Sequence, residues 1–220
     1  TLPHDLDYIL SEINRYWREA DSEQRVDEAD RFYKQRAEGH IPNWESFTAD
    51  QKEGALPSGF DEKIHNVAVY PSSEDEFVAI GEEWDNPIYR DQRAGLNRVA
   101  ADLEGESDVH LYVRVHPNLA GVDNEQTREL DELDDRNGVT VIPAASSISS
   151  YALLHASDCV LTFGSTMGIE ATYWRKPSVL AGMCFYRDLG ATYIPESHRQ
   201  VIRFLKDSSL SPKPVEPSLK

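Results

Sequence analysis

Residues 159–174 read CVLTFGSTMGIEATYW, and this stretch decides the fold class. A short run of mainly apolar residues leads through a glycine into two hydroxyl residues, and a helix-forming run follows. A buried strand that turns directly into a helix is typical of a βαβ unit, in which the helix carries the chain to the next parallel strand. The stretch therefore predicts a strand over residues 159–163 and a helix over residues 166–174.

The same alternation extends over most of the chain. Short β-branched runs are separated by helical stretches of about ten residues, which is the layout of a parallel sheet covered by helices. Further strands are expected at residues 67–70, 110–115, 139–142 and 178–181, with helices at residues 91–103, 125–135, 148–155 and 197–206. The pattern predicts an α/β fold, a Rossmann-like parallel sheet of about five or six strands flanked by helices.

The N-terminal part of the chain follows a different pattern. Over residues 2–20 apolar side chains recur at spacings of three and four, which predicts an amphipathic helix. A second helix is expected over residues 23–38 and should stop at Gly39. A chain of 220 residues is too short for two full α/β domains. We therefore expect a helical segment and linker at residues 1–63, one Rossmann-like domain at residues 64–210 and a loose tail at residues 211–220.

The charge of the chain is strongly acidic. Lys and Arg total 22 against 39 Asp and Glu, which gives a formal net charge of -17. Such a surface repels nucleic acid and anionic membranes, so nucleic acid is excluded as the expected partner. The acidic residues are spread through every segment, and the strand-like runs are too apolar for a disordered chain. The composition therefore predicts a cytoplasmic protein adapted to high salt, of haloarchaeal type, and says little about substrate.

Other classes of site and location are disfavoured by the sequence. Cys159 and Cys184 show no metal-ligand spacing and no disulfide framework, and no metal site is expected. No apolar run has the length of a membrane span, and the first residues lack the layout of a signal peptide. Because the first residue is Thr, we expect the chain to be a piece of a longer protein.

Polar side chains follow four of the expected strands at the point where each strand ends. In an open parallel sheet, ligands bind outside the carboxyl ends of the strands, so these side chains should meet at one edge. They lie in the segments Pro71-Ser72-Ser73, His116-Pro117-Asn118, Pro143-Ala144-Ala145-Ser146 and Gly164-Ser165-Thr166. The sequence predicts a ligand site at this edge.

The fourth strand exit has the chemistry of an anion site. Backbone N–H groups at a helix start attract a phosphate, and Ser165 and Thr166 add hydroxyl donors. Glu170 follows Thr166 by four residues, where its carboxylate can accept hydrogen bonds from a ribose diol, and Gly168 permits close approach of ligand or neighbouring backbone. The alternative is that Ser165 or Thr166 merely caps the helix and that Glu170 is a solvated helix residue.

The second strand exit places an imidazole at the same edge. His116 ends the strand, and Pro117 fixes the chain that follows. The imidazole can donate to a phosphate oxygen or protonate a leaving group, although it can also simply cap its own loop. Arg114, inside the strand, is expected to pair with a buried carboxylate or to span the sheet edge.

Hydroxyl side chains complete the expected edge. Ser146 and its neighbouring serines can face the cleft, with at least one of them capping a helix. Ser72 and Ser73, followed by Glu74 and Glu76, can likewise be only a capped helix start. The phosphate- and nucleotide-binding candidates are Ser72, Ser73, Arg114, Pro117, Ser146, Gly164, Ser165, Thr166, Gly168 and Glu170, with His116 as the catalytic candidate.

Four segments together resemble a known family. YPSSEDEF at residues 70–77, VRVHPN at 113–118, SSISSYALL at 146–154 and FGSTMGIEATYWRKPSVLAG at 163–182 are similar to the C-terminal, donor-binding half of GT-B glycosyltransferase-like proteins of capsule and surface-polysaccharide biosynthesis. The resemblance covers residues 66–210. It implies that His116 and Pro117 lie beside the donor phosphate, that Ser165 and Thr166 hold that phosphate, and that Glu170 binds ribose or sugar hydroxyls.

The resemblance also implies substrates and an incomplete active site. The donor would be a CMP-, UDP- or GDP-linked sugar, no cofactor or metal would be needed, and the acceptor would be a glycan or glycolipid. A GT-B enzyme binds its acceptor with a second, N-terminal domain, for which this chain has no room. The chain is therefore expected to bind donor weakly and to lack full transferase activity alone.

Other functions remain open on the same scaffold, since a fold does not fix the chemistry. An activity like that of a nucleotide-sugar 2-epimerase or a glycerophosphotransferase is one alternative. A non-catalytic interaction domain is another, in which the N-terminal helix docks a partner or a second copy as a homo-oligomer. A peripheral position at the inner membrane face is compatible with each of these.

Overall fold

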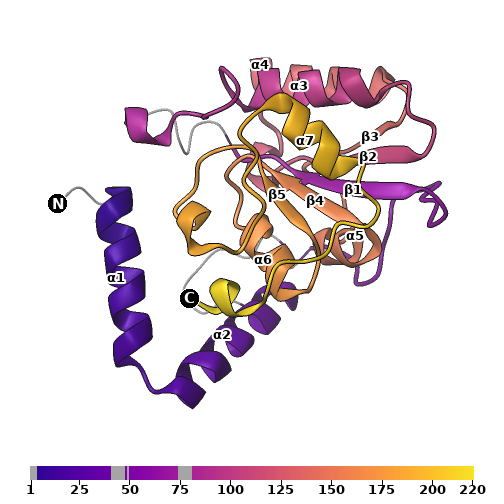
Figure 1. Ribbon diagram of the computed structural model, residues 1–220. Coiled ribbons are helices and arrows are strands. Elements are labelled where there is room, and N and C mark those ends of the chain that lie inside the picture. The colour runs from indigo at the N-terminus through magenta and orange to yellow at the C-terminus, as the bar shows by residue number, and fades with distance from the viewer. Residues whose placement is uncertain (1–3, 41–47, 49, 74–80) are drawn as a thin grey trace.

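The computed structural model describes residues 4–40, 48, 50–73 and 81–220 (Figure 1). The strands are β1 (His65–Tyr70), β2 (Val109–Arg114), β3 (Val139–Ile142), β4 (Cys159–Thr162) and β5 (Ser178–Leu180). The α-helices are α1 (Leu6–Glu19), α2 (Ser22–Ala37), α3 (Gln92–Leu103), α4 (Glu125–Glu132), α5 (Ser150–Ala156), α6 (Met167–Tyr173) and α7 (His198–Leu205). The predicted α/β fold is confirmed, with each expected strand and helix present within a few residues of its predicted ends.

The five strands form one parallel sheet in the order β3-β2-β1-β4-β5. Val67 of β1 pairs with Leu111 of β2 on one side and with Cys159 of β4 on the other. The chain moves outward from β1 to β3 and then returns to β4, so the direction of winding reverses between β1 and β4. Ligand crevices of open α/β sheets form at such a switch point, outside the carboxyl ends of the two strands.

Helices cover both faces of the sheet, as Figure 1 shows. On one face, Leu96 of α3, Leu130 of α4 and Val201 of α7 pack with β-strand side chains such as Val69. On the other face, Leu153 and Leu154 of α5 and Ala171 of α6 pack against Ala68, Tyr70 and Val160. Because both faces of the sheet are buried, the strands are almost continuously apolar. These apolar runs are the pattern from which the strands were predicted.

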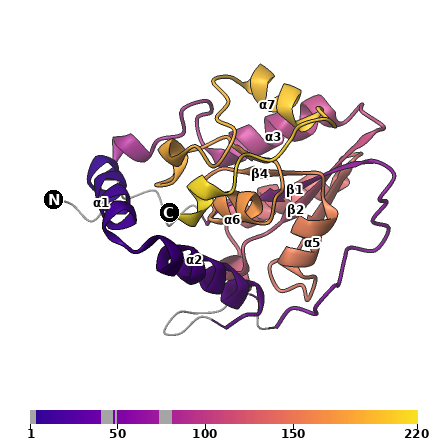
Figure 2. The same cartoon turned by 60° about the horizontal axis from the view of Figure 1, so that its bottom comes forward.

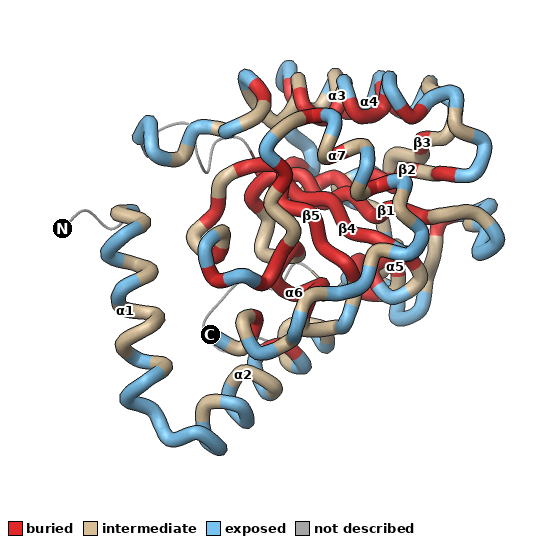
Figure 3. The backbone as a smooth tube through the Cα atoms, viewed as in Figure 1, coloured by how far each residue is buried: buried red, intermediate tan, exposed pale blue. Residues whose placement is uncertain are grey.

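The first two helices form a helical arm, residues 4–40, beside the sheet domain (Figure 2). Helix α1 begins after the cap Asp5 and has no buried residue, whereas α2 buries Tyr33, whose ring stacks on Tyr173 at 4.2 Å between centroids. In Figure 3 the tube of α1 is exposed or intermediate along its whole length. As predicted, the second helix ends before Gly39, which has a φ of 75° that favours glycine.

Parts of two predictions lie outside the described residues. These are the first residues of the N-terminal helix, predicted to start at Leu2, and most of the helix start expected around Glu74 and Glu76. The connector predicted up to residue 63 is described only at residues 48 and 50–63 beyond residue 40. None of the described helices is long and apolar enough to cross a membrane.

The C-terminal segment differs from the expected loose tail. Residues Glu216–Leu219 form a short 3-10 helix that contacts α2 and α6. The Tyr33 hydroxyl donates to the Ser218 carbonyl at 2.5 Å, and Ser218 is buried. The physical reason is that the buried hydroxyl of Tyr33 needs a hydrogen-bond acceptor, and this segment supplies one. The two residues are far apart in the sequence, so no periodic pattern indicates the contact.

Candidate functional site at the carboxyl edge of the sheet

A small cavity of about 80 Å³ lies at the switch point between β1 and β4, and we call it the edge cavity. It is framed by the ends of β1, β2 and β4, by the start of α5 and α6, and by the end of α2. Its lining residues are Arg36, Thr48, Tyr70, Pro71, Arg114, His116, Pro117, Ser150, Tyr151, Ser165, Thr166 and Met167. The parallel sheet thus brings Arg114, His116, Pro117, Ser165 and Thr166 together from two predicted strand exits.

The other predicted site residues do not line this cavity. They are Ser72, Ser73, Ser146, Gly164, Gly168 and Glu170. Ser73 instead lines a separate cavity with Arg93 and Asn118. The convergence of four strand exits is therefore partly realised, with the second and fourth exits contributing most.

The edge cavity is cationic. Arg36 and Arg114 contribute two guanidinium groups and His116 contributes an imidazole, and none of the described residues that line it is acidic. This contrasts with a chain that carries 39 acidic residues. A concave site lined by guanidinium, imidazole and hydroxyl groups favours an anionic ligand group.

Arg114 is only 3% exposed and holds the turn after β3. Its Nη1 donates to the Pro143 carbonyl at 2.6 Å, and its Nη2 donates to the Ser146 carbonyl at 3.1 Å. Of the two expected roles, pairing with a buried carboxylate is wrong, and the bonds across the sheet edge to the Pro143 and Ser146 carbonyls match the other. Burial lowers the pKa of Arg114, and its Nε has no hydrogen-bond partner among the described residues.

His116 lies where the sequence predicted, at the exit of β2. Its Nδ1 accepts from the Asn118 N–H at 3.2 Å, so the ring caps its own loop. The same ring lines the edge cavity next to Pro117. The capping alternative is therefore observed, and the contact with a ligand phosphate stays a prediction.

Glu170 is 1% exposed and is the centre of a hydrogen-bonded network of three helices. Its Oε1 lies 3.0 Å from Nη2 of Arg36 in α2 and accepts from the Thr166 hydroxyl at 3.0 Å. Its Oε2 accepts from the hydroxyl of Tyr151 in α5 at 2.5 Å. The solvated alternative for Glu170 is wrong, and a ribose diol would have to compete with these protein donors.

The network perturbs its other members. Burial, together with the Glu170 carboxylate, raises the pKa of the Tyr151 hydroxyl far above its ordinary value, so this phenol remains a hydrogen-bond donor. Burial alone would lower the pKa of Arg36, but charge and hydrogen bonding from Glu170 and Tyr151 together outweigh it, and the net direction is upward. Arg36 and Glu170 are therefore a charged pair in which the arginine is fixed in place.

The small size of Gly168 serves packing. A Cβ at this position would lie 2.3 Å from the Tyr186 hydroxyl oxygen and 2.7 Å from Oγ1 of Thr162. Gly168 thus permits close approach, as predicted, but the neighbours are protein side chains. The Gly164 carbonyl lies 3.0 Å from the Cys184 sulfur, so the observed contact of this glycine is with the protein interior.

The predicted serines have structural contacts. The Ser72 carbonyl accepts from the Gln92 and Gln126 side chains, while its hydroxyl is buried without a partner among the described residues. Ser146 lends its carbonyl to Arg114, and Ser149 is the serine that caps α5. The expectation that one serine of this run caps a helix is confirmed.

Several lining residues carried no recognisable signal in the sequence. Arg36 lies in the arm, 134 positions before its partner Glu170, and Thr48 lies in the connector. Tyr70 is the last residue of β1 and directly precedes the first strand exit. Its position at a strand end is the one signal in the sequence that could have identified it. Ser150 and Tyr151 belong to the serine-rich segment after β3, and the packing of α5 places them at the cavity.

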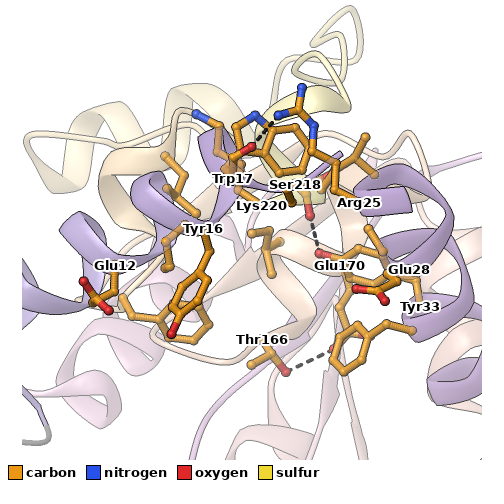
Figure 4. A pocket seen from close by; sticks show the side chains of 18 of the residues that line it. Glu12, Tyr16, Trp17, Arg25, Glu28, Tyr33, Thr166, Glu170, Ser218 and Lys220 are labelled. Atoms are coloured by element: carbon orange, nitrogen blue, oxygen red, sulfur yellow. Dashed lines mark hydrogen bonds between the residues drawn. The ribbon is translucent and has the colours of Figure 1, made fainter. Parts of the chain in front are cut away.

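A second, larger cavity of about 880 Å³ lies between the arm and the sheet domain, and we call it the arm cavity. Figure 4 shows Tyr16 of α1 on one side of it and Glu170 of α6 on another, with Thr166 at the bottom of the view. Apolar residues that line it include Ile9, Ile13, Trp17, Phe32, Ile169, Phe185 and Leu189. Arg36 and Thr166 line both cavities, so the two spaces share a wall.

The chain is similar to known proteins in sequence and in fold. A family model described as capsule polysaccharide biosynthesis protein matches residues 87–208. Two solved structures from Thermosulfurimonas dismutans match: the KpsC beta Kdo 2,4 transferase, with 21% identity and a TM-score of 0.52, and the KpsC beta Kdo 2,7 transferase, with 17% identity and a TM-score of 0.50. No curated protein sequence matches significantly.

The structural matches cover nearly all of this chain and only part of the others. They span 91% and 90% of this chain but 55% and 53% of the two transferase chains. The chain therefore spans about half the length of these structures. The likeness supports the GT-B-like fold that the sequence motifs predicted.

Proposed function

The chain belongs to the family of capsule polysaccharide biosynthesis proteins, and from this premise we propose that it is the donor-binding half of a metal-independent glycosyltransferase of surface-polysaccharide synthesis. The donor is a sugar linked to a nucleoside mono- or diphosphate. The observation that carries the proposal is the cationic edge cavity at the switch point of the sheet.

The size of the edge cavity supports a phosphate as the group that it holds. A volume of about 80 Å³ has room for a phosphate group. It is too small for a whole nucleotide sugar, because sites for small molecules usually occupy about 300–1,000 Å³. The nucleoside and the sugar would therefore extend out of this cavity along the sheet edge.

The lining side chains suit a departing nucleotide phosphate. When the bond between sugar and phosphate breaks, negative charge builds up on the phosphate oxygens. Arg114 and His116 supply positive charge or donors at this position, and the Ser165 hydroxyl can add a hydrogen bond. The Thr166 hydroxyl already donates to Glu170, so in this proposal Thr166 lines the phosphate position without donating to it. In this proposal His116 contacts the leaving group, and no metal ion is needed to stabilise it.

The acceptor is proposed to bind outside these 220 residues. The two Kdo transferase structures are almost twice as long as the part that this chain matches. A glycan or glycolipid acceptor would meet the donor across the carboxyl edge of the sheet, where a second domain would face it. Donor binding is accordingly proposed for this chain alone, and transfer only for a protein with both halves.

Calorimetry in molar KCl tests this proposal. The folded protein is titrated with CMP, UDP and GDP and with sugars linked to each of them, since the charge of -17 favours high salt. We expect one nucleotide class to bind with saturable heat. Absence of binding by all of them, with the protein shown to be folded by circular dichroism, would overturn the proposal.

A second candidate role rests on α1. This helix has an amphipathic sequence but no buried residue, and Tyr8 and Tyr16 are 44% and 61% exposed. Leu10 and Ile13 of this helix pack partly against the sheet domain, and the two tyrosines remain exposed. Exposed aromatic side chains of this kind are typical of an interaction surface. The candidate role is self-association through α1. Sedimentation equilibrium tests it, because a monomer at all concentrations would exclude it.

A further inference from the structure

The arm reaches the predicted ligand site through a single arginine. Arg36 belongs to the last turn of α2, and only it and Thr166 line both the edge cavity and the arm cavity among the described residues. Its side chain is 22% exposed, so it is accessible from these spaces. Arg36 is therefore the described cation that a ligand would meet on passing from one cavity to the other.

The guanidinium is held in one orientation by only part of its donor set. Its Nε donates to Oε1 of Glu170 at 3.1 Å, and its Nη2 donates to Oγ1 of Thr166 at 3.3 Å. The ring of Phe32 lies 5.5 Å from the guanidinium carbon. The Tyr151 hydroxyl interacts with the same guanidinium. Together Glu170, Thr166 and Tyr151 leave at least one of the five N–H donors of the arginine available.

The carboxylate that orients Arg36 is itself fixed. Glu170 is buried and accepts from Tyr151 and Thr166 as well as from Arg36. A side chain held in this way binds a ligand without losing much conformational freedom. The network therefore preorganises Arg36 for contact with a group in the edge cavity.

We propose that Arg36 is a ligand-binding residue that contacts the phosphate group of the ligand, and that Glu170 is a positioning residue that orients Arg36. The inference rests on the proposed function, because it adds a contact to the same site. It also assigns the arm to the ligand site and gives Glu170 a role different from the ribose contact that the family resemblance implies.

The test compares a nucleotide with its nucleoside. For the nucleotide that binds best, we expect Arg36→Ala to lower affinity roughly 10- to 100-fold, as for loss of a hydrogen bond to a charged group. Affinity for the matching nucleoside, which has no phosphate, should stay unchanged. Arg36→Lys should retain part of the nucleotide affinity, and guanidinium ion added at low concentration should restore part of the binding to Arg36→Ala.

Arg31→Ala is the matched control. Arg31 lies on the same helix, is exposed and lines only the arm cavity, so this variant makes the same change in net charge. It should bind nucleotide as the unsubstituted protein does. Equal losses in the two alanine variants would mean that general charge is responsible, and the proposal would be overturned.

Glu170→Gln separates positioning from direct contact. If Glu170 orients Arg36, this variant should bind nucleotide more weakly and nucleoside unchanged. If Glu170 binds ribose, both affinities should fall together, which would overturn its role as a positioning residue. If Arg36→Ala does not fold because the buried Glu170 carboxylate has lost its cationic partner, the double variant Arg36→Ala, Glu170→Gln replaces it. This double variant has no buried carboxylate at position 170, and its nucleotide and nucleoside affinities are compared with those of Glu170→Gln.

Inorganic pyrophosphate distinguishes failure of this inference from failure of the proposed function. Pyrophosphate binding that depends on Arg36, with no nucleotide bound, would retain Arg36 as an anion-binding residue and refute the nucleotide-sugar proposal. Nucleotide binding that is equally tight in Arg36→Ala would refute the role of Arg36 and leave the nucleotide-sugar proposal standing. Absence of both nucleotide and pyrophosphate binding by the folded protein would overturn both.

Discussion

At the scale of single residues, His116 has an observed structural role and a proposed chemical one. Its Nδ1 accepts from the backbone N–H of Asn118, which fixes the ring at the end of β2. The sequence motif predicted the residue and the edge correctly, because a strand end in a parallel sheet has a defined place. The motif identifies the position of the ring, and contact between the ring and a phosphate is a proposal that ligand binding tests.

The first prediction is that His116→Ala weakens phosphate-dependent binding. Loss of one hydrogen bond to a charged phosphate should reduce nucleotide affinity by about tenfold or more and leave nucleoside affinity unchanged. Calorimetry measures both. His155→Ala is the control, because His155 packs against Trp174 away from the edge cavity. Unchanged nucleotide affinity in His116→Ala would remove this residue from the site.

The second prediction concerns Gly168. An added methyl group would meet the hydroxyl of Tyr186, which is fully buried and donates to the Ser165 carbonyl at 2.6 Å. Gly168→Ala should lower the free energy of unfolding by about 1–3 kcal/mol, as overpacking of a core usually does. Urea denaturation followed by circular dichroism measures the change.

Gly105→Ala is the matched variant for this measurement. No atom lies within 4 Å of the position that its Cβ would take, so its stability should be almost unchanged. If both variants unfold at the same urea concentration, the close contact between α6 and Tyr186 does not limit this position.

At the scale of elements, the arm and the C-terminal segment form one contact with α6. Tyr33 of α2 stacks on Tyr173 and donates to the Ser218 carbonyl. The strands and helices of the sheet domain could be predicted because each has its own periodic pattern. The contact of α2 with α6 and the tail could not, because the paired residues are far apart in sequence and carry no shared pattern.

The third prediction is that Tyr33→Phe loosens this contact. The variant keeps the stacked ring and loses the hydrogen bond, which should lower the free energy of unfolding by about 0.5–1.5 kcal/mol. Thermal denaturation measures the effect. Tyr8→Phe, which changes an exposed phenol of α1, should unfold as the unsubstituted protein does. Identical stability of all three proteins would show that the Ser218 contact contributes nothing.

At the scale of the whole molecule, the charge of -17 is spread over the surface and spares the edge cavity. Repulsion among these charges opposes the compact state and is weakened by salt. The sequence indicated the acidic surface and the ligand edge separately. The structure brings residues of the arm, the connector and three strand exits together around this cavity, and none of its described lining residues is acidic.

The fourth prediction is that KCl stabilises the protein. Raising KCl from low to molar concentration should increase the midpoint temperature of unfolding, since shorter screening lengths reduce the repulsion. Differential scanning calorimetry measures the midpoint, with sucrose at equal osmolality as the uncharged control. A midpoint that rises equally in sucrose, or not at all in KCl, would show that repulsion among surface charges is not the cause.

The packing of the last residues against α2 has a practical consequence for protein engineering. Lys220 lines the arm cavity, and Ser218 is hydrogen-bonded to the arm. An affinity tag fused after Lys220 would emerge beside the arm cavity and could press α2 away from α6. Since α2 carries Arg36, a tag that displaces this helix would also displace a side chain that lines the edge cavity, and a cleavable tag should be removed before binding is measured.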